Sequence, residues 1–322
     1  MLPVLDIVIV NWNSGDQLRR CLESMNKIDT RSFNLGSVIV VDNASRDHSA
    51  DSLSSDRISL RVIRNESNRG FAAACNQGAR KSGADYLLFL NPDTRLLPNS
   101  LTVPISFMQE PANTTIGICG IQLLDEEGNV SRNCVRFPTP GRVLAMIFGL
   151  QRLMPHRFPQ LLMVDWDHSA NRDVDQVMGA FYLVRGELYR ELGGFDERFF
   201  VYYEEVDFAW RAKQLGWRTH YLSTAQAFHK GQGTTKSVSE IAFFYLLRSR
   251  VLYMAKHFGS LYAFSIFVLM ATVEPLTRSF AAMCESSASR LKTVLGGFWR
   301  FWLASPKILV RVVRQDASPA TN

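Results

Sequence analysis

The chain has 322 residues, of which 47% are apolar and 20% are charged, and its formal net charge is +6. This composition is typical of a chain that folds and excludes a disordered one. The five cysteines are odd in number and include no C-x-x-C pair, which favours free thiols in a reducing compartment over a disulfide framework. Met1-Leu2-Pro3 carries no basic segment, so no signal peptide is expected.

The positive charge is concentrated near the C-terminus. Residues 241–322 contain ten Lys or Arg and three Asp or Glu, which leaves residues 1–240 with a net charge of −1. This asymmetry predicts an anionic partner for the C-terminal part, and a membrane surface suits it better than nucleic acid because no nucleic-acid-binding motif is present. We therefore expect a domain over 1–240 and a basic, aromatic-rich helical region over 241–322.

Short apolar, β-branched runs alternate with helical patterns in the N-terminal third of the chain. Ala72–Lys81, rich in small residues, is predicted to be a helix. Strands are expected at Leu5–Val10, Val38–Val41, Leu60–Ile63 and Tyr86–Leu90. Because strands alternating with helices of this length indicate βαβ units, the sequence predicts an α/β fold with a mainly parallel central sheet.

The middle of the chain continues the strand pattern less regularly. Pro138–Pro159 is irregular and basic, and it is predicted to be a mobile loop or short helices near a bound substrate. Small residues at Gly179-Ala180 would permit close approach of a ligand or of backbone. Further strands are expected at Ile116–Gln122, Val130–Val135, Val174–Val184 and Trp217–Leu222.

Polar side chains stand where three predicted strands end: Asn11, Asp42, and the turn Asn91-Pro92-Asp93. If these strands are parallel, the three lie at one edge of the sheet, where α/β folds bind ligands. Asp42 could accept from a base or ribose, and Asp93 is a hard oxygen ligand for a cation that holds phosphates. No glycine-rich phosphate loop occurs, so a nucleotide here would need such a metal, although Asn-Pro-Asp alone is usually only a turn.

A cluster of carboxylates opens a helix predicted to start near Tyr203. Glu204, Asp207 and Arg211 share one face at helical spacing, whereas Glu205 points about a third of a turn away. Acids in a first turn also complement the helix dipole. Three carboxylates in four residues exceed that need, and because crowding raises their pKa values they suit a general base.

A single histidine, His229, stands in a stretch with nearby glycines that is predicted to be a loop closing over phosphates. A lone His is more often structural than a ligand, so this residue gains meaning only with the other motifs.

The C-terminal region is predicted to begin with a helix over Ile241–Phe258 that docks on the core. Leu261–Val273 is uncharged but shorter than the roughly 20 residues of a spanning helix, and Glu274-Pro275 is expected to stop it. The basic residues that follow are interleaved with Trp299 and Trp302, which is typical of helices lying in the interface of anionic membranes. The alternative is a buried helix followed by a solvated basic tail.

Seven stretches occur in order over residues 6–234: VIVNWNSGD, VIVVDNASRD, NRGFAAACNQG, FLNPDT, MGAFYLVRGELYRELGGFDERFF, EEVDFAWR and HKGQGT. Each alone is a weak signal, but together they are specific. In order and character they resemble the motifs of family 2 glycosyltransferases, which have the GT-A fold, and more narrowly those of the bacterial rhamnosyltransferase-like members.

The resemblance implies donor-binding roles at matching positions. Asn11 and Asp42 would contact the nucleoside, and Arg69 and Asn76 would line the diphosphate. Asn91 takes the first position of the family's D-x-D element, where it departs from the usual Asp, and it is assigned to substrate binding.

The resemblance also implies the metal and the base. Asp93 would hold Mg²⁺ or Mn²⁺, and His229 matches a position that can complete the metal shell. Glu205 takes the second position of the family's Glu-Asp pair, the general base. Because Glu replaces Asp there, Glu204 and Asp207 remain alternatives.

The implied activity is a metal-dependent, inverting transfer of a sugar from a nucleotide-diphosphate donor. TDP-rhamnose is the favoured donor, and the acceptor is a cell-surface glycan or a lipid-linked intermediate. The expected location is cytoplasmic, at the inner face of the membrane. The alternative is a non-catalytic nucleotide-sugar-binding or assembly protein of the same fold, which intact Asp93, Glu205 and His229 disfavour.

Overall fold

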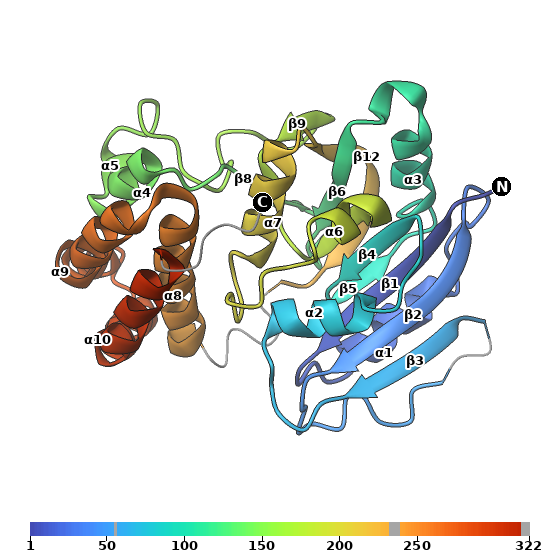
Figure 1. Ribbon diagram of the computed structural model, residues 1–322, viewed down its shortest axis with the longest axis horizontal. Coiled ribbons are helices and arrows are strands. Elements are labelled where there is room, and N and C mark those ends of the chain that lie inside the picture. Colours follow the sequence, from blue (N-terminus) through green and yellow to red (C-terminus); the bar gives the residue numbers. More distant parts are fainter. Residues whose placement is uncertain (55–56, 232–238, 317–322) are drawn as a thin grey trace. The chain divides into compact units, whose positions relative to one another are not determined.

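The computed structural model describes residues 1–54, 57–231 and 239–316 (Figure 1). Contacts within the chain divide it into two compact units. The two regions expected from the sequence, 1–240 and 241–322, are each continuous. The second unit of the structure also includes two segments from earlier in the chain. The first unit is Met1–Arg136, Leu162–Glu197 and Glu204–Thr234; the second is Phe137–Leu161, Arg198–Tyr203 and Thr235–Asn322.

A ten-stranded sheet, counted over the described residues, forms the centre of the first unit (Figure 1). Its main path is β3-β2-β1-β4-β11-β6-β12-β5, with β7 paired to β6 and β9 paired to β12. The strands are β1 (Val4–Asn11), β2 (Asn34–Asp42), β3 (Ser59–Arg64), β4 (Tyr86–Leu90), β5 (Thr94–Leu96), β6 (Ile116–Leu124), β7 (Val130–Ser131), β9 (Arg172–Val174), β11 (Phe181–Arg185) and β12 (Arg218–His229).

The sheet is mixed but mostly parallel in its central part, which confirms the predicted α/β class. Strands β3, β2, β1 and β4 run parallel, as do β6 and β12. Strand β11 is inserted antiparallel between β4 and β6, with Phe181 opposite Leu90. The start of β11 therefore lies at the same edge as the ends of β1, β2 and β4.

Helices cover both faces of this sheet. On one face, α1 (Gln17–Met25) and α3 (Thr102–Gln109) share a core cluster with alternate strand residues such as Leu88 and Leu90. On the other, Phe89 of β4 packs against Tyr189 of α6 (Gly186–Glu191), and α2 (Phe71–Ala79) packs close to β1 and β2. This alternation along β4 explains why Tyr86–Leu90 is apolar at every position.

Two of the predicted strands are broken in the structure. The stretch predicted as Val130–Val135 forms β7 and then β8 (Cys134–Val135), because buried Asn133 interrupts it. The Asn133 side-chain amide donates to the Ile121 carbonyl, and the backbone carbonyl of Asn133 accepts from the Met178 N–H. The strand β8 consequently pairs with β10 (Gln176–Val177) and not with β6.

The stretch predicted as one strand over Val174–Val184 is divided among β9, β10 and β11, which pair with three different partners. Conversely, β12 extends seven residues beyond its predicted end at Leu222. The prediction that His229 lies in a loop covering phosphates is thus wrong, because His229 is the last residue of a strand. The rest of that predicted loop, residues 232–234, lies outside the described part of the chain.

The second unit is helical. The stretch Pro138–Pro159 contains two short helices, one of the two predicted possibilities, and the predicted helix over Ile241–Phe258 is confirmed. The helices are α4 (Pro140–Ile147), α5 (Leu150–Leu153), α8 (Ser239–Phe258), α9 (Ser260–Cys284) and α10 (Ala288–Asp316).

The prediction that Glu274-Pro275 stops a helix is wrong, because α9 continues through both residues to Cys284. Proline at position 275 removes the N–H that would bond the Ala271 carbonyl. The indole N–H of Trp302, on α10, donates to that carbonyl over 2.9 Å instead. A tertiary contact therefore supplies what the local sequence lacks.

With α9 at 25 residues, one helix among those described is long and apolar enough to cross a membrane by length and composition alone. A third of its most apolar window is buried inside the structure. This indication of membrane association is weak, because a single core helix of a folded protein passes the same test of length and composition.

Candidate active site

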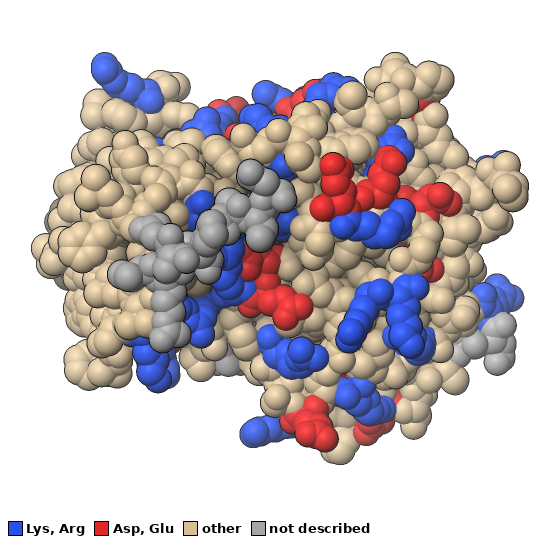
Figure 2. All heavy atoms as spheres, in the orientation of Figure 1, with Lys and Arg blue, Asp and Glu red and all other residues tan. Residues whose placement is uncertain are grey.

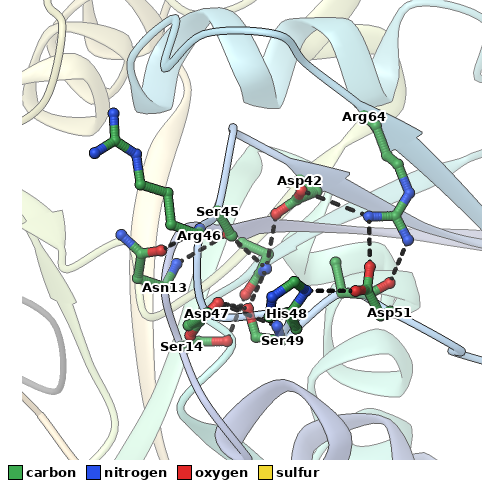
Figure 3. A network of polar contacts seen from close by, with 12 residues as sticks. Asn13, Ser14, Asp42, Ser45, Arg46, Asp47, His48, Ser49, Asp51 and Arg64 are labelled. Carbon is green, nitrogen blue, oxygen red and sulfur yellow. Dashed lines mark hydrogen bonds and ion pairs between the residues drawn. The ribbon is translucent and has the colours of Figure 1, made fainter.

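Polar side chains are hydrogen bonded to one another at the edge of the sheet where β1 and β2 end. Asn11 and Asp42 are register partners in the parallel pair, and the Asn11 side-chain amide lies 2.9 Å from Asp42 Oδ1. Its nitrogen is also within 3.0 Å of the hydroxyls of Ser45 and Ser49, which converge with Asp42 in Figure 3. Because Asn11 is fully buried, these contacts give it the role of holding Asp42 in place.

The second carboxylate oxygen of Asp42 faces a cation at longer range. Arg64 Nη1 lies 3.9 Å from Asp42 Oδ2 and 3.1 Å from Asp51 Oδ1 (Figure 3). Within the described part of the chain, Oδ2 has only this distant cation, whereas Oδ1 accepts the short hydrogen bond from Asn11. The Oδ2 atom is therefore better placed than the buried Asn11 side chain to accept a hydrogen bond from a ligand. That Asp42 and Asn11 contact a nucleoside stays a prediction.

Asn43, next in the chain, shapes the loop before α2. Its carbonyl-type oxygen accepts from the Arg69 backbone N–H at 3.0 Å, and its amide nitrogen donates to Asn68 and to the Gly70 carbonyl. Gly70 has a φ of 89°, which favours glycine at this turn. The loop presents Arg69 with an exposed side chain at the start of α2.

Arg69 is part of a basic stretch of surface. Figure 2 shows Lys and Arg side chains grouped where α2 and β3 lie in Figure 1. A positive potential there favours the approach of anionic ligands. The exposed basic residues on β3, on the loop and near the end of α2 are Arg61, Arg64, Arg69, Arg80 and Lys81.

The turn after β4 is held from the start of β11. The Ala180 carbonyl accepts from the Asn91 N–H at 3.1 Å and from the Thr94 hydroxyl at 3.2 Å. The Thr94 N–H also closes the turn onto the Asn91 carbonyl. With both ends fixed, Asp93 projects from a rigid turn, and its side chain is 10% exposed.

His229 meets Asp93 at this turn. Strand β12 pairs with β5 so that His229 lies opposite Thr94, and His229 Nε2 is 3.3 Å from Asp93 Oδ1. The Lys230 N–H donates to the Asp93 carbonyl. The sequence motifs that predicted these two residues as a pair lie far apart along the chain, and the sheet brings them together.

The carboxylates of Glu204 and Glu205 open α7 (Glu204–Gln214), as predicted. Glu204 is 4% exposed, and each of the two side chains has a buried oxygen that lacks a hydrogen-bond partner among the described residues. Burial raises the pKa of both, and the proximity of Glu205 raises the pKa of Glu204 further. Two such groups cannot both ionise easily near neutral pH.

The backbone N–H of Gly179 distinguishes the two glutamates. It hydrogen bonds to the carboxylate of Glu205, which lowers that group's pKa against the effect of burial. Glu204 receives no corresponding help from another segment, and its pKa lies well above the ordinary value. Of the two carboxylates, Glu205 is therefore the one whose charged form the backbone of another segment stabilises.

Asp207, the other alternative, is engaged elsewhere. It is fully buried, and Arg211 Nε donates to its Oδ2 over 2.8 Å. The two terminal nitrogens of Arg211 donate to the carbonyls of Leu192 and Gly194. This ion pair fixes the loop after α6.

Asn76 anchors the same loop from α2. Its oxygen accepts from the Tyr189 hydroxyl and the Phe195 N–H, and its nitrogen donates to the Phe195 carbonyl and to Glu197. The side chain is thus occupied within the protein, and its predicted contact with a diphosphate stays a prediction.

Sequence reasoning missed the backbone partners of the site. It identified Gly179-Ala180 only as small residues that permit close approach, whereas their N–H and carbonyl groups hold Glu205 and the Asp93 turn. No side-chain motif could reveal these contacts, because backbone groups are the same at every position.

Comparison with known proteins identifies the family of this chain. A model of glycosyl transferase family group 2 matches residues 86–310, and one of glycosyl transferase family 2 matches residues 6–155. N-acetylglucosaminyl-diphospho-decaprenol L-rhamnosyltransferase of Mycobacterium tuberculosis is 25% identical over 71% of this chain and 76% of its own length. Rhamnosyltransferase WbbL of Escherichia coli is 27% identical over 78% of this chain and 92% of its own length.

Among solved structures, the mannosyltransferase PcManGT from Pyrobaculum calidifontis, in complex with GDP-Man and Mn²⁺, has a TM-score of 0.55 with 15% identity. The match covers 99% of this chain and 88% of that protein, and it supports a GT-A-like fold. With the family models covering most of the sequence, the chain belongs to the family 2 glycosyltransferases and is similar to their rhamnosyltransferase members.

Proposed function

We propose that this glycosyltransferase moves L-rhamnose, or a related hexose, from a nucleoside-diphosphate donor to a lipid-linked or cell-surface glycan with inversion at C1. TDP-rhamnose is the first donor to test, because two relatives are rhamnosyltransferases by name. The observation that carries the proposal is that the sheet brings His229 Nε2 within 3.3 Å of Asp93 Oδ1, on a turn that the Ala180 carbonyl holds.

The side chains at Asp93 suit a divalent cation that also binds phosphate oxygens. Among the described residues no group of three or more His, Cys, Asp or Glu side chains could hold a metal ion. Asp93 and His229, 3.3 Å apart, would supply two ligands, and phosphate oxygens and water would complete the shell of Mg²⁺ or Mn²⁺. Bound there, the ion would neutralise charge on the departing diphosphate.

The residues of the chain then divide the remaining work. Asp42 and Asn91 contact the donor, and Arg69 faces the diphosphate from the start of α2. Glu205 accepts the proton of the acceptor hydroxyl while that oxygen forms its bond to C1 and the bond from C1 to the diphosphate oxygen breaks. General-base help of this kind contributes about 10²–10⁴-fold to the rate. One displacement inverts the anomeric centre.

We also propose that the second unit attaches the enzyme to the inner face of the cytoplasmic membrane. The outer face of α9 exposes Leu261, Phe264 and Leu276, and α10 exposes Trp299 and Leu303 beside its basic residues. Apolar anchors flanked by cations bind anionic interfaces, where a lipid-linked acceptor would be found.

The test is donor turnover by the full chain and by Glu205→Gln. TDP-rhamnose, UDP-glucose, UDP-galactose and GDP-mannose are each incubated with Mg²⁺, with Mn²⁺ and with a chelator, and both binding and slow hydrolysis are measured. We expect metal-dependent turnover of one donor, lost by about 10²-fold or more in Glu205→Gln while donor binding persists.

Glu191→Gln, an exposed glutamate on α6, is the matched control and keeps full turnover. Binding without turnover in the parent chain would favour a non-catalytic nucleotide-sugar-binding protein. Retained configuration in the NMR spectrum of the product would contradict a single displacement.

A further inference from the structure

We infer that Arg250 of α8 is a positioning residue for Glu205 and that it acts through Tyr203, the residue before α7. The inference rests on the proposed role of Glu205 as the base. It concerns the segment Arg198–Tyr203, here called the strap, which leads directly into Glu204 and Glu205 and which belongs to the second compact unit.

Three consecutive residues of α8 hold the strap. Arg248 Nη2 donates to the Arg198 carbonyl at 3.3 Å, and the Ser249 hydroxyl donates to the Val201 carbonyl at 3.1 Å. Arg250 Nε donates to the Tyr203 hydroxyl at 3.4 Å. These contacts fix the strap at its beginning, middle and end.

Aromatic packing adds to these bonds. Phe200 of the strap stacks on Tyr245 of α8 with ring centroids 4.6 Å apart and planes 17° apart. Tyr203 packs on Tyr253 of α8, with centroids 5.3 Å apart. The strap is therefore held on α8 by side-chain packing as well as by hydrogen bonds.

The backbone at the end of the strap adopts a conformation that needs such support. Tyr202 and Tyr203 have φ values of 66° and 75°, in the left-handed region that bulky residues rarely adopt. Such strained conformations persist only where the surroundings determine them. The helix α7 begins at the next residue, so this geometry sets where the helix starts.

Arg250 is itself rigid. It is 2% exposed, and its Nη1 lies 2.9 Å from both carboxylate oxygens of Glu274, which is fully buried. Arg278 Nε binds the same carboxylate at 2.6 Å. A guanidinium fixed on a buried carboxylate presents its remaining N–H in one direction, which a Lys side chain cannot reproduce.

The consequence follows from covalent continuity. Glu204 is bonded to Tyr203, and Glu205 is the next residue, whose carboxylate must meet the Gly179 N–H. A shift of about 1 Å at the helix start would carry Glu205 away from that N–H and from the acceptor oxygen, and misplacement of this size costs about 10²-fold in rate. Loss of the Gly179 bond would also raise the pKa of Glu205.

The test compares Tyr203→Phe and Arg250→Lys with the parent chain in the donor assay, measuring kcat, KM and the pH dependence of kcat/KM. Tyr203→Phe removes only the hydroxyl and keeps the ring on Tyr253, so it should fold. Tyr221→Phe is the matched control, because it removes a buried hydroxyl that donates to the His168 carbonyl, away from the strap.

We expect kcat to fall about 10- to 100-fold in both strap variants, with donor KM within about twofold and the acid limb of the pH profile displaced upward. The ionisable groups facing Glu205 are Glu204 on its own helix, Cys75 on α2 and Tyr182 on β11. Burial raises the pKa of the thiol and of the phenol, so they stay neutral and the displaced limb reports on the glutamate pair.

Folded strap variants with the parent kcat and pH profile would overturn the inference, as would an equal loss in Tyr221→Phe. Glu205→Gln in the same assay separates two kinds of failure. If Glu205→Gln is inactive while both strap variants behave as the parent, only the positioning inference fails. If Glu205→Gln remains active, the assignment of the base fails and the inference fails with it.

Discussion

At the scale of single residues, the chemistry depends on how two adjacent buried glutamates share their charge. Burial raises the pKa of each, but only Glu205 receives the Gly179 N–H. Ionisation of Glu204 would therefore oppose that of Glu205. A base whose pKa lies closer to neutral pH also takes a proton more readily than an exposed glutamate does.

The same shift predicts how stability depends on pH. The folded-state pKa of Glu204 lies well above the ordinary value of 4.5 that the unfolded chain has, so the folded state binds a proton more tightly. Below pH 4.5 the group is protonated in both states and costs nothing. As pH rises through the folded pKa, the folded state loses stability relative to the unfolded state.

Glu204→Gln should remove this penalty. We expect its Tm to exceed that of the parent chain at pH 8 and to match it at pH 4.5, as measured by thermal unfolding in the two buffers. Glu191→Gln, an exposed change on α6, should shift Tm equally at both values. A Tm difference for Glu204→Gln that is larger at pH 4.5 would contradict the assignment of a raised pKa.

The residue scale also shows where sequence prediction ends. Asn11 and Asp42 were predicted to be neighbours because parallel strands align their ends, and the register confirms it. That Asn11 is buried and serves Asp42 depends on Ser45 and Ser49 folding back onto it, which the motif does not encode. In the same way, Asn76 contacts Phe195 only through the packing of α2 on the loop after α6.

At the scale of elements, α9 shows how a tertiary contact overrides local sequence. Proline normally ends or kinks a helix because a carbonyl four residues earlier is left unpaired. Here the Trp302 indole occupies the Ala271 carbonyl, and Glu274 is neutralised by Arg250 and Arg278. Strands with uniform apolar patterns, such as β4, were predictable because burial on both faces leaves a local signature.

A double-mutant cycle tests this account of α9. Trp302→Phe should lower the free energy of unfolding by about 1 kcal/mol, because the ring remains while the Ala271 carbonyl loses its donor. In a Pro275→Ala background the new backbone N–H can bond that carbonyl, so Trp302→Phe should cost less there. Urea unfolding of the four chains measures the coupling.

The paired control for the cycle is Trp299→Phe, an exposed indole on α10. It should show the same small effect with Pro275 and with Ala at that position. An equal cost for Trp302→Phe in both backgrounds would contradict the proposed replacement of the missing hydrogen bond.

At the scale of the whole molecule, the two units differ in how well sequence predicts them. The first unit follows from alternating apolar runs, and its site follows from polar residues at strand ends, because sheet edges convert sequence order into proximity. The antiparallel insertion of β11 was not predicted, since a short apolar strand carries no mark of its direction. The second unit also includes Phe137–Leu161 and the strap, which come from earlier in the chain.

The charge and exposure of the second unit predict binding to anionic vesicles. The full chain should sediment with vesicles of phosphatidylcholine and phosphatidylglycerol, and much less with phosphatidylcholine alone. Binding should weaken as salt rises, because about 1 kcal/mol per basic residue near the surface is screened. Replacing the exposed Phe264 and Trp299 by Ser should reduce binding further, since both bury apolar area in the interface.

Leu215→Ser, which is similarly exposed but lies on the first unit, is the control and should bind as the parent does. Equal binding to neutral and anionic vesicles would remove the electrostatic part of the proposal. No binding to either would leave the exposed apolar face of α9 and α10 to a protein partner.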